Sequence, residues 1–105
     1  MVKRKIEFDQ LNWNQAAEGF RYKEQKVGSH KIRLVEISDT FVEKEWCLHS
    51  HTGIVIEGRL DIQFEDELIT YSKGEGILIM SGDLFKHKAQ VRTGESATLL
   101  LFEPN

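Results

Sequence analysis

The residues best suited to chemistry lie in one short stretch of the chain, between residues 45 and 58. It holds the single cysteine and two histidines at alternate positions, Cys47, His49 and His51. Successive side chains of a β-strand point to opposite faces, so an extended chain places these three, with Glu45, on one face. Thiolate and imidazole select zinc, copper or iron, so the spacing indicates a metal site. The alternative is a set of buried polar residues hydrogen-bonded inside a barrel.

The composition is that of one globular domain. A length of 105 residues is close to the commonest domain size, so we expect a single domain over residues 1–105. The net charge is −3 and no basic stripe is present, which argues against nucleic acid as a partner. No apolar run approaches the roughly 20 residues of a membrane helix, which argues against a membrane partner. With one cysteine and no apolar leader after the basic start, we expect a reducing, cytoplasmic location.

The elements that must position these residues are short strands. Segments rich in β-branched and apolar residues alternate with turns that contain glycine, which is typical of a sandwich or barrel and predicts an all-β fold. Gly58, in the middle of the longest segment, predicts a bulge or a sharp bend. The expected strands cover residues 20–24, 30–37, 41–51, 54–64, 68–71, 77–80, 85–91 and 97–102.

The first part of the chain gives weaker signals. Residues 6–8 form a short apolar segment that suits a strand. Residues 12–19 suit one or two helical turns, with Asn14 as the N-cap and Gly19 ending the helix in the left-handed conformation. We therefore expect a short helical turn near the N-terminus, held in place by tertiary packing, because a helix this short is marginal alone.

Two stretches resemble the sequence motifs of the cupin family. Residues 54–60, Ile-Val-Ile-Glu-Gly-Arg-Leu, are similar to the Val-Leu-Glu-Gly core of the first motif. Residues 74–82 are similar to the second motif, which begins with Gly and ends in Pro-x-Gly-x-x-His. The resemblance covers residues 35–103 and is closest to the small single-domain bacterial cupins. It implies a double-stranded β-helix, or jelly-roll barrel, and a homodimer, because such proteins are often dimers.

This chain departs from the first cupin motif at its metal ligands. Counted back from Gly58 without gaps, the two motif histidines fall on Glu45 and Cys47, and the motif glutamate falls on His51. If residues 49–51 are taken instead as the His-x-His pair, a deletion is required and the motif glutamate is missing. The usual set of three histidines and one glutamate is therefore absent under either alignment.

The second motif departs in the same way. Met80 stands at the motif proline and Phe85 at the motif histidine, and His87 follows two residues later. On a regular strand His87 shares the face of Phe85, where the family places its inward histidine. The resemblance, read with this parity, predicts that His87 points into the barrel.

The predicted site combines both motifs. The residues expected to contact a ligand in the barrel are Cys47, His49, His51, Phe85 and His87. Among them Cys47, His51 and His87 are expected to converge and to suit a divalent metal, such as Zn, Fe, Mn or Ni, with water in a fourth position. The sequence leaves open which of His49 and His51 faces the cavity.

Two functions fit this site. The first is a binding module or sensor that holds a small, partly apolar organic ligand, with or without a metal, because Phe85 in place of histidine makes the cavity more apolar. The alternative is a metal-dependent enzyme of the isomerase, dioxygenase or cyclase kind. A nucleophilic pair of Cys47 with His49 or His51 requires an environment that stabilises the thiolate, which a sequence does not display.

Overall fold

The structure of the chain, a computed structural model, describes residues 4–104 and confirms the predicted all-β fold. No α-helix occurs in that range, and two 3-10 turns interrupt the strands, η1 (Phe8–Gln10) and η2 (Asp83–Phe85). Nor does any helix there have the length and apolar character of a membrane-spanning segment. The strands are β1 (Asn14–Ala17), β2 (Phe20–Val27), β3 (His30–Ser38), β4 (His51–Phe64), β5 (Leu68–Ser72), β6 (Gly76–Ile79), β7 (His87–Gln90) and β8 (Ser96–Pro104).

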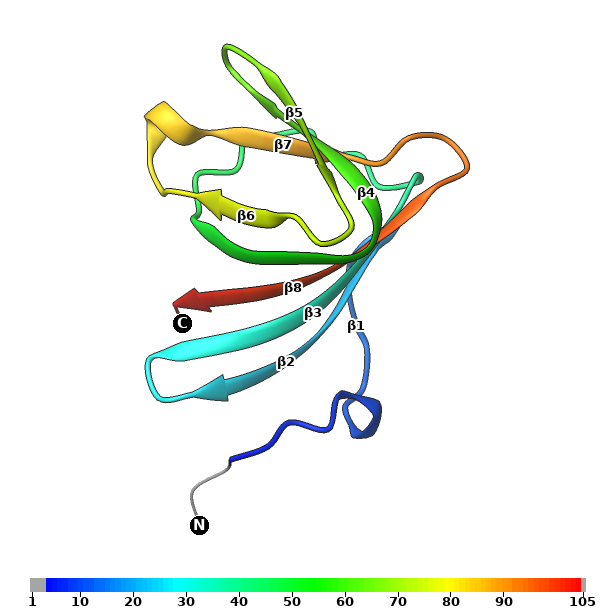
Figure 1. The fold of residues 1–105 in the computed structure, drawn as a ribbon, viewed down its shortest axis with the longest axis vertical. Coiled ribbons are helices and arrows are strands. Elements are labelled where there is room, and N and C mark those ends of the chain that lie inside the picture. Colours follow the sequence, from blue (N-terminus) through cyan, green and yellow to red (C-terminus); the bar gives the residue numbers. More distant parts are fainter. Residues whose placement is uncertain (1–3, 105) are drawn as a thin grey trace.

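The long strand β4 joins the two halves of a curled sheet. The strands are ordered β1-β2-β3-β8-β4-β5, all antiparallel, and β6 and β7 also pair with β4. The first half of β4 lies between β8 and β6, and its second half lies between β5 and β7 (Figure 1). The sheet folds over along β4, which gives the barrel-like jelly roll that the cupin resemblance implies.

Gly58 is where β4 turns from one half of the sheet to the other. Its φ of +73° lies in the left-handed region, and the register with β8 shifts between Val55 and Glu57. A Cβ atom built on Gly58 would overlap the carbonyl oxygen of Ser96. Both the backbone conformation and the close approach of β8 therefore require glycine, and the predicted bulge or bend is confirmed.

The core fills the concave side of the sheet. Burial alternates along β6, β8 and the end of β3, as the period of two requires. Leu60, Val35 and Val55 are the largest fully buried side chains. The other buried apolar residues are Ile37, Ile62, Ile77, Ile79, Val91, Ala97, Leu99 and Leu101. Because β8 alternates strictly from Ala97 to Leu101, the next inward position is Glu103, a carboxylate at the end of an apolar row.

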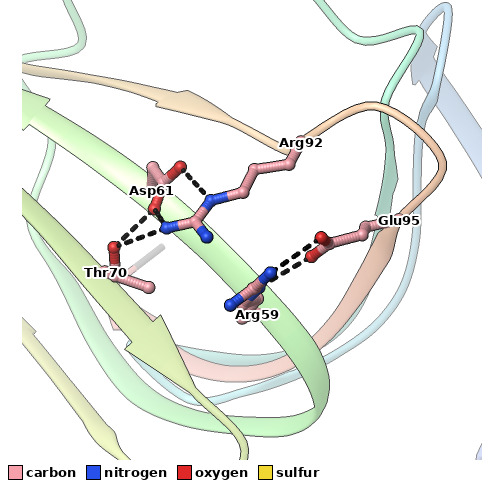
Figure 2. Close-up of polar contacts among 5 residues, drawn as sticks. All are labelled: Arg59, Asp61, Thr70, Arg92 and Glu95. Carbon is pink, nitrogen blue, oxygen red and sulfur yellow. Dashed lines mark hydrogen bonds and ion pairs between the residues drawn. The ribbon is translucent and has the colours of Figure 1, made fainter.

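A polar network holds the second half of β4 against its neighbours. The buried carboxylate of Asp61 accepts hydrogen bonds from Arg92 Nε (3.0 Å), Arg92 Nη2 (3.1 Å) and Thr70 Oγ1 (2.6 Å), as Figure 2 shows. Beside it, Arg59 donates two hydrogen bonds to Glu95. The network links β4 to β5 and to the segment after β7. It therefore fixes the strand that carries His87.

Three local predictions are wrong. Residues 14–17 form strand β1 rather than a helix, because the backbone of β2 supplies the hydrogen bonds that so short a helix lacks. Gly19 does adopt a left-handed conformation, with φ +75°, but at the turn between these strands. Residues 6–8 form no strand, and η1 begins at Phe8. Residues 41–50 are irregular rather than a strand, because their backbone pairs with the sheet only at the bridge between Cys47 and His87.

The convex side of the sheet carries exposed apolar residues in register. Thr52 pairs with Phe102 on one side and with Leu78 on the other, and Ile54 pairs with Leu100. Leu78 is 79% exposed and Phe102 is 48% exposed. We call Ile54, Leu78, Leu100 and Phe102 the outer apolar face.

The conformation of Gly58 gives a test of the bend. Gly58→Ala should lower the free energy of unfolding by about 2 kcal/mol or more, because it adds backbone strain to a collision with Ser96. Gly74→Ala is the matched control: its φ is +87°, but no atom lies within 4 Å of the added Cβ. It should lose only about 1 kcal/mol. Equal losses in urea denaturation would contradict the close packing of β8 on Gly58.

Candidate metal centre

Three side chains, two of them four residues apart and the third from a later strand, converge at one end of the barrel. The potential ligand atoms of Cys47, His51 and His87 all lie within 4.8 Å of one another. Cys47 Sγ lies 3.6 Å from His51 Nε2, and the two imidazole rings meet edge to face with centroids 5.1 Å apart. His87 is buried, whereas Cys47 and His51 are partly accessible. The structure thus shows the convergence that the sequence predicts.

Backbone pairing explains why these residues meet. Cys47 and His87 form an isolated antiparallel bridge, with N–H to O=C distances of 2.8 Å and 3.1 Å. This bridge fastens the irregular segment before β4 to the first residue of β7. His51 is the first residue of β4 and lies opposite Ile79 of β6, so its side chain shares the concave face. Three separate elements therefore each deliver one ligand atom.

Each imidazole is fixed through Nδ1. His51 Nδ1 lies 2.7 Å from Glu103 Oε2, and the other oxygen of Glu103 accepts a hydrogen bond of 2.9 Å from Arg33 Nη1. His87 Nδ1 lies 3.0 Å from the carbonyl oxygen of Phe85, to which it donates. Both bonds occupy Nδ1 and leave Nε2 as the ligand atom. Metal-binding histidines are held in this way, by a carboxylate or a backbone carbonyl on the second nitrogen.

The electrostatics favour a thiolate. Hydrogen bonds from His51 and His87 lower the pKa of Cys47 to about 6, against the opposing effect of burial. Burial acts to lower the pKa of His51, but hydrogen bonds with Cys47 and Glu103 outweigh it and raise this pKa to about 9. Burial acts to raise the pKa of Glu103, but His51 and Arg33 outweigh it and lower this pKa to about 2. The site therefore holds a row of alternating charges at neutral pH.

The donor set fits a metal ion. Zn–S bonds of about 2.3 Å and Zn–N bonds of about 2.0–2.1 Å at a tetrahedral angle place sulfur and nitrogen about 3.6 Å apart. The distance from Cys47 Sγ to His51 Nε2 is 3.6 Å. With His87 as the third ligand, a tetrahedral ion would keep one position open, which is typical of catalytic rather than structural zinc.

A cavity of about 380 Å³ opens beside these ligands. Its walls are mostly apolar, with Val35, Ile37, Leu60 and Leu99 among them, and the three candidate ligands are among its polar lining residues. Glu43 also lines it, and Glu43 Oε1 accepts a hydrogen bond of 2.8 Å from the backbone N–H of Ala89. The cavity is large enough for a small organic molecule.

The structure brings four of the five predicted site residues to this cavity. Cys47, His49, His51 and His87 line it, and His49 is the most exposed of them. Phe85 does not line it: this residue lies in η2 and its side chain is 38% exposed. The 3-10 turn breaks the strand parity between residues 85 and 87, so the prediction that Phe85 faces the cavity is wrong. Only its carbonyl oxygen acts on the site, through His87.

Three site residues were missed by the sequence analysis: Arg33, Glu43 and Glu103. Two of them left a signal. Glu103 continues the inward positions of β8, and Arg33 continues those of Val35 and Ile37 on β3, so each is a charge in an apolar row. Glu45, in contrast, shares the predicted face but is exposed and outside the cluster.

The contacts of Glu103 predict a large effect on stability. In the presence of a chelator, Glu103→Ala should lower the free energy of unfolding by about 3 kcal/mol, because it leaves Arg33 and His51 without their buried partner. Glu57→Ala removes an exposed ion pair with Lys73 and should lose no more than about 1 kcal/mol. Similar losses in urea denaturation would show that the Glu103 contacts do not support the site.

Several proteins of known structure share the fold of this chain. No protein-family model and no curated protein matches the sequence. A cupin-2 domain-containing protein from Shewanella frigidimarina is 28% identical, with a TM-score of 0.66 over 80% of this chain and 79% of that one. The polyketide cyclase RemF from Streptomyces resistomycificus is 15% identical, with a TM-score of 0.79 over 98% and 80%. A sugar phosphate isomerase of the cupin superfamily from Silicibacter pomeroyi is 15% identical, with a TM-score of 0.77 over 97% and 76%. This chain is a cupin-fold protein.

Proposed function

We propose that the barrel binds one divalent transition metal through Cys47, His51 and His87 and holds a small organic molecule in the adjoining cavity. The orientation of the two imidazoles carries this proposal. Each ring gives Nδ1 to a fixed acceptor and leaves Nε2 for the ion, while the thiolate completes the set. The thiolate favours a borderline ion such as zinc or iron over manganese.

The geometry favours a metal over a nucleophilic cysteine. A nucleophile needs one base and one group that orients this base, and Cys47, His51 and Glu103 supply that arrangement. In that arrangement the second imidazole, that of His87, takes no part in the reaction. His87 is nevertheless buried, fixed through Nδ1 and within ligand distance of the other two. A metal centre uses all three side chains.

When bound, the metal would supply Lewis acidity toward an oxygen atom of the molecule in the cavity. The chain itself supplies the rest of the site. The apolar walls exclude water and hold the carbon frame, and Glu103 holds His51 in the orientation for binding. A reducing cytoplasm is the location that suits this site, because the free Cys47 must stay reduced to bind the ion as a thiolate.

A metal-dependent enzyme is the second candidate function, and Glu43 favours it. Its carboxylate lines the same cavity and has one oxygen fixed by the backbone of Ala89. A carboxylate that faces a bound molecule suits proton transfer. Among the structures of similar fold are a polyketide cyclase and a sugar phosphate isomerase, so the fold hosts reactions of these kinds.

Elemental analysis of purified protein tests the metal centre. The wild type, grown in supplemented medium, should contain close to one zinc or iron per chain. His51→Ala and His87→Ala should each lose most of this metal, because each removes one of three ligands. His30→Ala is the control: His30 is exposed and contacts Ser29, outside the cluster.

A metal-free wild type, or metal retained by both cluster variants, would contradict the proposal. Native mass spectrometry of the same wild-type preparation tests the cavity. It should show mass beyond the chain and its metal when the cellular ligand is retained. Treatment with organic solvent should release this ligand for identification.

We further propose that two copies of the chain pair through the outer apolar face. Exposed apolar residues that adjoin on one sheet face indicate an interface, and closed pairing of identical faces is the commonest assembly. Leu78 is its most exposed member, and a charge placed there would be desolvated on pairing.

Sedimentation velocity tests the pairing. The wild type should be a dimer at ~50 µM, well above the dissociation constants of specific dimers. Leu78→Glu should sediment as a monomer. Leu84→Glu is the control, because Leu84 is 91% exposed in η2 and outside this face, so this variant should stay dimeric. A monomeric wild type would remove the proposed interface.

A further inference from the structure

A second cavity, of about 330 Å³, lies at the barrel mouth and is polar where the first is apolar. The ends of four strands surround it. Lys31 and Arg33 come from β3, Ser50 and His51 from just before and at the start of β4, Ser81 from just after β6, and Glu103 from the end of β8. Arg33, His49 and His51 line both cavities, so the two adjoin at the candidate metal centre.

The single carboxylate of this polar pocket is already paired. One oxygen of Glu103 accepts from Arg33 and the other contacts His51 Nδ1, so both are occupied from the side of the barrel. Lys31 and Arg33 bring two permanent positive charges to the pocket, against the single negative charge of Glu103. The pocket therefore carries an excess of positive charge, although the whole chain has a net charge of −3.

The hydrogen-bond donors of the pocket are largely free. Among residues 4–104, Lys31 forms no ion pair, and the hydroxyl groups of Ser50 and Ser81 form no hydrogen bond. Within the same range Arg33 donates one hydrogen bond, from Nη1 to Glu103. Its guanidinium lies over the ring of Tyr22, 4.5 Å from the centroid, which fixes its plane. Among residues 4–104, Arg33 Nε is thus buried without a hydrogen-bond partner, and Nη2 has no protein acceptor.

We propose that this pocket is an oxyanion subsite that binds the acidic group of the molecule held in the cavity. Two cations and two hydroxyl groups around one space match a carboxylate or a phosphate group. The ligand is then a small organic acid, with its acidic group at the mouth and its apolar part in the barrel. This assignment rests on the proposed function, because it takes the occupant of the cavity as the bearer of the acidic group.

Titration of the purified protein with inorganic phosphate and with acetate tests the subsite. Amide shifts in nitrogen–proton NMR spectra should change in a saturable way at residues 31, 50 and 81. Lys31→Gln should weaken binding about tenfold, the effect of one lost charge-assisted hydrogen bond. Ser81→Ala should weaken it by a smaller factor without any change of charge. Lys73→Gln removes the same charge at an exposed position outside the pocket and should leave binding unchanged.

The outcomes separate the subsite from the metal centre. Tighter binding of phosphate assigns a phosphate ligand, and tighter binding of acetate assigns a carboxylate. The absence of saturable binding, equal weakening by Lys31→Gln and Lys73→Gln, or binding unaffected by both pocket variants overturns the subsite. Metal content is measured on the same samples. Metal without anion binding rejects the subsite alone, whereas Lys31-dependent anion binding without metal rejects the proposed metal centre and leaves the subsite standing.

Discussion

The buried carboxylate of Glu103 is the constraint on which the site depends. A charge in this position is stable only if it is paired, and Arg33 and His51 supply the partners. The contact with His51 directs Nδ1 toward Glu103 and therefore Nε2 toward Cys47. The same pairing turns Arg33 toward the mouth of the barrel. One carboxylate thus orients both a candidate metal ligand and one of the two cations of the adjoining polar pocket.

Much of the fold could be predicted because its signals are local. The turn glycines and the alternation of apolar residues gave most of the strands, and Gly58 marked the bend by its position alone. The segment around Cys47 was mistaken for a strand, because its alternating Cys and His residues imitate strand periodicity. Its backbone joins the sheet through one bridge, from Cys47 to His87, which no local pattern encodes.

The convergence of the three candidate ligands was predicted from the sequence, by an argument that was partly wrong. Strand parity placed Cys47 and His51 on one face, whereas the structure brings them together through a bridge and the start of β4. Parity also placed Phe85 on the face of His87, but Phe85 lies in the 3-10 turn η2 and only its carbonyl contributes. Glu103 and Arg33 escaped notice because their contact joins positions 70 residues apart. Long-range pairing of this kind follows from the register between β3 and β8.

The central claim is that one sulfur and two imidazole nitrogens bind a single metal ion in this barrel. X-ray absorption spectroscopy of the metal-loaded protein tests it most directly. The account predicts one sulfur at about 2.3 Å and two imidazole nitrogens at about 2.0–2.1 Å, with the sulfur signal lost in Cys47→Ser. A first coordination shell of nitrogen and oxygen alone in the wild type would contradict it.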